Sequence, residues 1–206
     1  MNEKGRSMVE MLGVLAIIGV LSAGGLAGYS KAMFQHKMNQ TIDEATKIFQ
    51  RFEEIKEKDW GATDTDLLWI DSPEAAVQYG LIDKCANPSR IEGATLGCQL
   101  PMGYVSFDLA QEKNNSADCG NGTWGNIHFA FSDSKSCNAF LSVHWENVLP
   151  VDWWANHSGI YLWARNNSHS IFNGSQPLTM DNITNTCLEC DTNGHCLITF
   201  TYRGYC

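Results

Sequence analysis

Cysteine is the residue type in this chain with the most evident chemistry, and all eight cysteines lie beyond residue 84. They are Cys85, Cys98, Cys119, Cys137, Cys187, Cys190, Cys196 and Cys206. Cys187 and Cys190 have the spacing of half a zinc site, with His195 and Cys196 close behind, but a second pair with suitable spacing is absent from the sequence. An even number of cysteines indicates disulfides if this part of the chain is exported, because thiols oxidise outside the cytoplasm. The apolar run described below predicts such export. We predict disulfides and keep zinc as the alternative.

Oxygen ligands and nucleophiles give weaker signals. The stretch Asp191–Gly194 reads Asp-Thr-Asn-Gly and places oxygen ligands beside a glycine, which makes it a candidate calcium loop. The rest of an EF-hand loop and its bidentate glutamate are missing from the sequence. It also lacks a nucleophile elbow, an HExxH motif and a phosphate-binding glycine loop. We therefore expect no enzyme activity, no cofactor and no metal, with calcium as the alternative at Asp191.

A single acid, Glu10, stands inside an apolar run near the N-terminus. Residues 5–29 read GRSMVEMLGVLAIIGVLSAGGLAGY. A carboxylate at the centre of a membrane helix costs roughly 2.5–3.5 kcal/mol, so this acid needs a partner. Residues 11–30 are uncharged and just long enough to span a bilayer core. With Lys4 and Arg6 before the run, we predict one membrane span with a cytoplasmic N-terminus, and keep a cleaved secretory signal and a plain anchor as alternatives.

The pattern after residue 30 is that of an amphipathic helix. Apolar residues recur at spacings of three and four, with charged residues between them. The apolar positions are Met38, Ile42, Ala45, Ile48, Phe49, Phe52 and Ile55. Because no proline or turn cluster separates this part from the membrane run, we predict one helix from about Arg6 to Lys58, roughly 80 Å long. A coiled-coil seam is the alternative for its second half.

The remaining residues, 61–206, are enough for one domain core. A formal charge of −9 argues against a generally basic surface for nucleic acid. Residues 72–80 predict a short helix that starts with Ser-Pro and ends at Gly, and Ser134 to Asn147 predict a second helix capped by Ser134. Short segments rich in aromatic and β-branched residues predict strands. These are Tyr104–Leu109, Ile127–Phe131, Ile160–Trp163 and Cys196–Tyr202.

The order of parts at the N-terminus resembles the N-terminal motif of type IV prepilins and type II secretion pseudopilins. Gly5 is followed by Arg6, then Ser-Met-Val-Glu ending at Glu10, then the apolar run through Ala16–Leu21. The resemblance implies cleavage after Gly5 by a prepilin peptidase and N-methylation of Arg6. It also implies that Glu10 pairs with the N-terminal amine of a neighbouring subunit, which would neutralise a carboxylate that is otherwise costly to bury.

The same resemblance implies a division of the chain. It comprises a leader at 1–5, a transmembrane and assembly half at 6–30, an amphipathic half at 31–60 and a globular head at 61–206. Glycines near the end of the membrane run would allow close helix packing or local melting of the helix. They are Gly19, Gly24, Gly25 and Gly28, around the place where the family often has proline and this chain has Ala27.

The head is similar in element order to the heads of larger type IVb-like pilins. The expected fold class is therefore α+β, with the long helix packed on a small antiparallel sheet held by disulfides. By this analogy Cys137 pairs with Cys187, Cys190 or Cys196, of which we favour Cys187. We also favour Cys85 with Cys98. An aromatic cluster after the second predicted helix is interpreted as core, with adhesion through Trp153 and Trp154 as the alternative. It comprises Trp145, Trp153, Trp154, Tyr161 and Trp163.

The expected function is that of a pilin-like subunit, held in the bacterial inner membrane and then built into a filament in the periplasm or at the cell surface. Its expected partners are the lipid bilayer before assembly, a prepilin peptidase, inner-membrane assembly machinery and identical or related subunits. A type II secretion pseudopilin and a membrane-anchored binding protein that does not polymerise are the alternatives. No nucleic-acid partner is expected.

Overall fold

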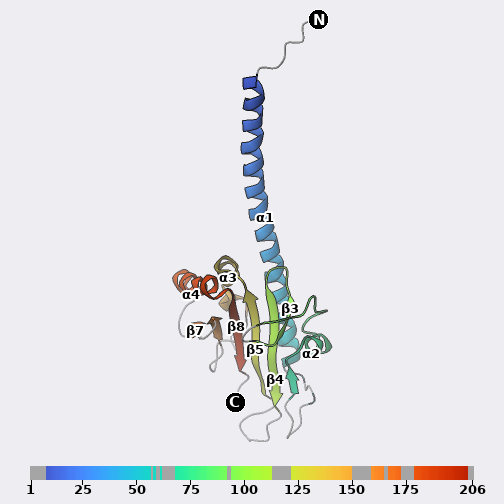
Figure 1. The fold of residues 1–206 in the computed structure, drawn as a ribbon. Coiled ribbons are helices and arrows are strands. Elements are labelled where there is room, and N and C mark those ends of the chain that lie inside the picture. The colour runs from blue at the N-terminus through green and yellow to red at the C-terminus, as the bar shows by residue number, and fades with distance from the viewer. Residues whose placement is uncertain are drawn as a thin grey trace.

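The computed structural model describes residues 8–56, 58, 61, 68–91, 94–112, 122–149, 159–164, 167–172 and 179–203. One helix, α1 (Met8–Lys56), runs for 49 residues and extends far beyond the head at its N-terminal end (Figure 1). The second half of α1 lies on one face of an antiparallel sheet. The fold is α+β, as predicted. Helix α1 ends at Lys56, two residues before the predicted end at Lys58, and the predicted start at Arg6 lies outside the described residues.

Eight described strands form the sheet in the order β2-β3-β4-β5-β8-β6-β7, with β1 beside β4. Their bounds are β1 Leu68–Ile70, β2 Ser89–Arg90, β3 Leu96–Gln99, β4 Tyr104–Glu112, β5 Gly122–Phe131, β6 Gly159–Ala164, β7 Asn167–Phe172 and β8 Cys196–Arg203. All pairs are antiparallel. The four predicted strands are confirmed within β4, β5, β6 and β8, whereas β1, β2, β3 and β7 were not predicted.

The core lies between α1 and the inner face of the sheet. The predicted apolar stripe is buried at six of its seven positions, and Ile42 is half-buried. The Phe49 ring lies at the centre of this core. Its centroid is 4.8 Å from the ring centroid of Phe200, 5.5 Å from that of Trp145 and 5.9 Å from that of Phe129. Aromatic pairs at such distances add to the free energy of burial. The amphipathic half of α1 is thus a core helix of the head.

Two short helices were predicted, and the structure corrects one of them. Helix α2 (Pro73–Gln78) begins at an N-cap by Ser72, as predicted. The second prediction was wrong in its extent and its cap. Helix α3 (Ser134–Leu141) is capped by Asp133, whose side chain accepts from the Ser136 N–H at 2.7 Å. It ends at Leu141, and a separate 3-10 turn, η1 (Trp145–Asn147), follows His144, which has a left-handed φ of 56°.

Helix α4 (Met180–Asn193) was not predicted. Thr179 caps its N-terminus by accepting from the Asn182 N–H at 3.3 Å. Gly194, with a φ of 78°, ends it in the left-handed conformation that glycine adopts at no steric cost. Helices α3 and α4 pack against each other beside the sheet (Figure 1).

Candidate functional site

The exposed N-terminal half of α1 is the most unusual surface of the molecule. Eleven large apolar side chains between Met8 and Tyr29 are each between 53% and 83% exposed. This helix contains an 18-residue window with a mean hydropathy of 2.1, none of it buried against the rest of the chain. A surface of this kind is unfavourable in water and marks a contact with lipid or another protein. One helix near the N-terminus is therefore long and apolar enough to cross a membrane.

Glu10 is the one acid between Met8 and Ser30, and it is exposed in the first described turn of α1. Gly5 and Arg6 lie outside the described residues, so cleavage and methylation there stay predictions. The four glycines predicted to allow close packing are open as well: a Cβ added at Gly19, Gly24, Gly25 or Gly28 would meet no atom within 4 Å. These positions would let the backbone of a second helix approach closely.

Comparison of the chain with protein-family models, curated proteins and solved structures finds no match.

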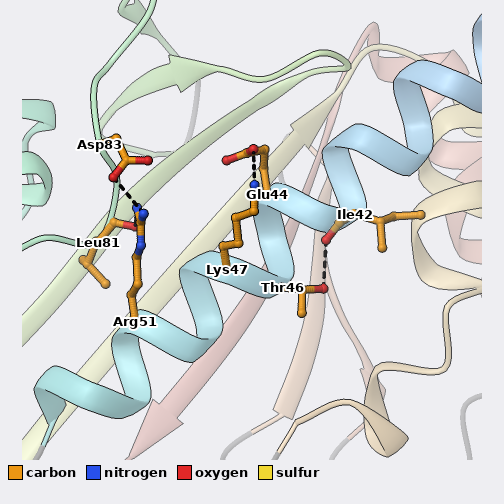
Figure 2. A network of polar contacts seen from close by, with 7 residues as sticks. All are labelled: Ile42, Glu44, Thr46, Lys47, Arg51, Leu81 and Asp83. Atoms are coloured by element: carbon orange, nitrogen blue, oxygen red, sulfur yellow. Dashed lines mark hydrogen bonds and ion pairs between the residues drawn. The ribbon is translucent and has the colours of Figure 1, made fainter.

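The second half of α1 is held to the head by contacts that begin where the exposed half leaves the sheet. The Lys135 Nζ of α3 lies 3.8 Å from the centroid of the Phe34 ring, a cation–π contact. Thr41 Oγ1 accepts from the Met102 N–H at 2.9 Å. Further along α1, Arg51 reaches across to Asp83 at 2.7 Å and to the Leu81 carbonyl (Figure 2). These contacts fix the direction in which the apolar half of α1 projects.

The C-terminal end of α1 is capped by side chains of the sheet. The last carbonyls of a helix have no partner within the helix and must find one elsewhere. Gln111 of β4 donates to the Lys58 carbonyl at 2.7 Å, and Thr123 of β5 donates to the Lys56 carbonyl at 2.8 Å. Both side chains are almost fully buried. The two central strands therefore bind the end of α1 through hydrogen bonds that a purely apolar interface would lack.

The six cysteines in the described part of the chain form disulfides, which answers the question left by their spacing. Cys85 joins Cys98 and Cys137 joins Cys187, the two favoured pairings, and both are confirmed. A third bond joins Cys190 to Cys196. Cys119 and Cys206 lie outside the described residues.

The alternative of a zinc site is wrong for this state of the protein. The sulfurs of Cys137, Cys190 and Cys196 lie within 4.8 Å of one another, as ligands of one ion would. Each of them is nevertheless bonded to a second sulfur, and zinc needs the free thiolate.

The candidate calcium loop is not a loop, because Asp191 belongs to the last turn of α4. Its carboxylate accepts from the Ser134 N–H at 2.8 Å and from the Ser134 hydroxyl at 2.6 Å. These two hydrogen bonds lower the pKa of Asp191 below its ordinary value. The carboxylate thus joins the start of α3 to the end of α4, and negative charge at a helix N-terminus is favourable.

Of the aromatic cluster, Trp145 is fully buried, which confirms the core interpretation for that residue. Trp153 and Trp154 lie outside the described residues. The exposed aromatic pair in the described part of the chain is a different one, Trp69 and Trp124, which the sequence reading did not single out. The alternation of buried and exposed residues along a strand could have indicated that Trp124 is exposed, because its neighbours Thr123 and Gly125 are both buried.

His128 of β5 is a buried titratable group on the outer face of the sheet. Only 6% of it is exposed, and its Nδ1 lies 2.9 Å from the Thr199 hydroxyl. Burial lowers the pKa of His128 from 6.5 to about 4, because the charged imidazolium loses its hydration.

We expect the head to lose stability as the pH falls from about 6.5 to about 4, because the unfolded chain binds a proton at His128 in this window and the folded chain does not. The loss should approach roughly 3 kcal/mol. Urea unfolding at a series of pH values measures it. His128→Gln should flatten this part of the pH profile, and the exposed His144→Gln should not. An unchanged slope in His128→Gln would contradict the assignment.

Proposed function

We propose that this protein is a type IV pilin-like subunit. In this proposal it is stored in the bacterial inner membrane, is processed after Gly5 by a prepilin peptidase, and is assembled into an extracytoplasmic filament by packing of its N-terminal helices. The observation that carries the proposal is the half of α1 that the head leaves uncovered, with one acid, Glu10, in an apolar surface.

The electrostatics of Glu10 support assembly rather than anchoring alone. A plain anchor gains nothing from a carboxylate in its apolar segment, which raises the free energy of insertion. In a packed bundle of helices the same carboxylate is stabilised by an ammonium of a neighbouring subunit, and the new N-terminus at Arg6 would supply that ammonium. Removal of one member of a buried ion pair costs about 3–5 kcal/mol, because the other charge is left unpaired.

The contacts that hold α1 to the head also support the proposal. Contacts from the segment between α2 and β2 (Asp83 to Arg51), from α3 (Lys135 to Phe34) and from the central strands all hold the second half of α1, so that the first half extends from a fixed base. The disulfides suit a head that functions in an oxidising compartment. Such a subunit can present one helix to several neighbours at the same orientation.

The test is Glu10→Ala in cells with working assembly machinery. We expect insertion and cleavage to continue, whereas filaments recovered by shearing should fall by more than about tenfold, as the cost of an unpaired ammonium predicts. The matched control is Glu44→Ala, which removes a half-exposed acid from the same helix, one that pairs with Lys47 three residues on (Figure 2). Normal filaments from Glu10→Ala would contradict the assembly mechanism.

Mass spectrometry of the purified protein tests the processing step separately. We expect a mature chain that begins at Arg6, with its terminal amine methylated. A chain that begins near Gly28 would indicate a cleaved secretory signal, and a chain that retains Met1 to Gly5 would indicate an unprocessed anchor.

A further inference from the structure

Two exposed tryptophans lie side by side on the outer face of the sheet, the face turned away from α1. Trp69 of β1 and Trp124 of β5 both pair with Ala110 of β4, from its two sides. Their ring centroids are 5.4 Å apart at an interplanar angle of 82°, so the rings meet above the fully buried Ala110. Each residue is 38% exposed. We call Trp69, Ala110 and Trp124 the aromatic platform.

A row of hydrogen-bonding side chains lies next to the aromatic platform on the same face. Asp108, Asn126 and Thr201 are paired in register across β4, β5 and β8, two residues along the strands from Ala110 and Trp124. Thr201 donates to the Asn126 side-chain oxygen at 2.8 Å, and the Asn126 side chain hydrogen-bonds Asp108. All three residues are half-buried and reach solvent. The Asp108 carboxylate keeps unused acceptor sites, since a carboxylate has about four.

We infer that the aromatic platform and the polar row form a binding site for a neutral saccharide. The flat C–H face of a pyranose ring with equatorial substituents would stack on the open indole surface. Its hydroxyl groups would donate to Asp108 and exchange hydrogen bonds with Asn126. Successive positions on one face of a strand are roughly 7 Å apart, which places the platform and the row within reach of neighbouring units of one chain.

The negative charge of this face disfavours anionic ligands. Asp71 follows β1 and lies close enough to Asp108 to raise its pKa, although burial is the larger cause of that rise. Among the described residues neither carboxylate has an ion-pair partner. Phosphates of a nucleic acid and the carboxylates of acidic glycans would therefore be repelled. A neutral ring avoids this cost and still uses the acceptors.

The geometry of the tryptophan pair also argues against a binding site for an organic cation. A quaternary ammonium is held by several ring faces that surround it. Here the rings are nearly perpendicular and in contact, so that the edge of one covers part of the face of the other. The arrangement leaves exposed indole surface on which a sugar ring can stack, beside a row of hydrogen-bonding groups.

The inference is tested with the full-length protein in phosphatidylglycerol nanodiscs, which avoid sugar-based detergents. The probes are cellohexaose and chitohexaose, both neutral and β-1,4-linked, titrated by calorimetry and by tryptophan fluorescence. We expect saturable binding of at least one probe. Trp69→Ala and Trp124→Ala should each weaken it about tenfold, equivalent to about 1.4 kcal/mol. Asp108→Asn, which preserves size, should weaken it several-fold.

Leu96→Ala is the matched control, because Leu96 is 40% exposed but lies outside the platform and the polar row. It should bind the probe as the unaltered protein does. If a tryptophan variant fails to fold, as near-ultraviolet circular dichroism would reveal, Asp108→Asn still decides the matter. If neither probe binds saturably at concentrations up to about 10 mM, the inference is wrong. It is also wrong if none of the folded variants weakens binding, or if tetramethylammonium displaces the probe. None of these outcomes depends on filament formation.

Discussion

Trp145→Ala is expected to destabilise the head by about 3–5 kcal/mol, the usual range for loss of a large buried aromatic side chain. Trp145 is fully buried in the aromatic core, where its ring lies 4.9 Å from Phe140, 5.5 Å from Phe49 and 5.6 Å from Phe200. Its indole N–H donates to the Phe140 carbonyl at 2.9 Å. The substitution leaves a cavity between α1, α3 and β8 and also leaves that carbonyl without this donor.

Urea unfolding of the full-length protein, followed by near-ultraviolet circular dichroism, measures the loss. Val148→Ala is the matched control, because Val148 follows the same turn but is 41% exposed. It should change the free energy of unfolding by no more than about 0.5 kcal/mol. A loss below about 1 kcal/mol for Trp145→Ala would mean that the site collapses around the smaller side chain and that the aromatic cluster is not the centre of the core.

Removal of the Cys137–Cys187 bond is expected to cost more than removal of the Cys190–Cys196 bond, although all four cysteines are fully buried. The first closes a loop with a sequence separation of 50 and the second a loop of 6. The loop-entropy relation then gives about 4 kcal/mol for the long loop and about 2 kcal/mol for the short one.

The experiment compares Cys137→Ala/Cys187→Ala with Cys190→Ala/Cys196→Ala in urea unfolding under oxidising conditions. Alanine avoids burying a hydroxyl group, and each double variant removes two buried sulfurs, so packing losses should be similar. The difference of about 2 kcal/mol between the variants then reports loop closure. Equal losses, or a larger loss for the short loop, would indicate that local packing and not the entropy of the unfolded chain determines the effect.

The parts of the fold that could be predicted are those in which one local signal dominates. The apolar stripe of α1 and the segment of β8 that begins at Leu197 have a clear periodicity, and Ser72 with Pro73 marks the start of α2. Helix α4 was missed because two of the three buried positions among its described side chains are cysteines, Cys187 and Cys190, with Ile183 as the third. Their spacing of four and three is helical, so treating half-cystines as apolar would have revealed it.

Other features depend on contacts that a sequence does not display. The break after Leu141 was missed because Trp145 and Leu141 are both buried, as one continuous helix would also require, while His144 adopts a left-handed conformation between them. The strands β1, β2 and β3 have four residues or fewer, and such lengths carry little pattern.

The candidate sites also differ in how far the sequence predicts them. The exposed run around Glu10 is evident from composition alone. The aromatic platform could not be predicted, because it depends on the register that places Trp69 and Trp124 on either side of Ala110.

The capping of α1 by Gln111 and Thr123 has a mechanical consequence. Tension applied to the exposed end of α1 would pass along the helix and enter the sheet at β4 and β5, its two longest strands, with nine and ten residues. Those strands share one continuous ladder of nine paired residues. A pull directed along these strands must break many of the hydrogen bonds together, whereas a pull directed across a strand breaks them one by one. Together with the contacts at Phe34, Thr41 and Arg51, the two caps would pass a pull on α1 to the centre of the sheet and not to an edge strand.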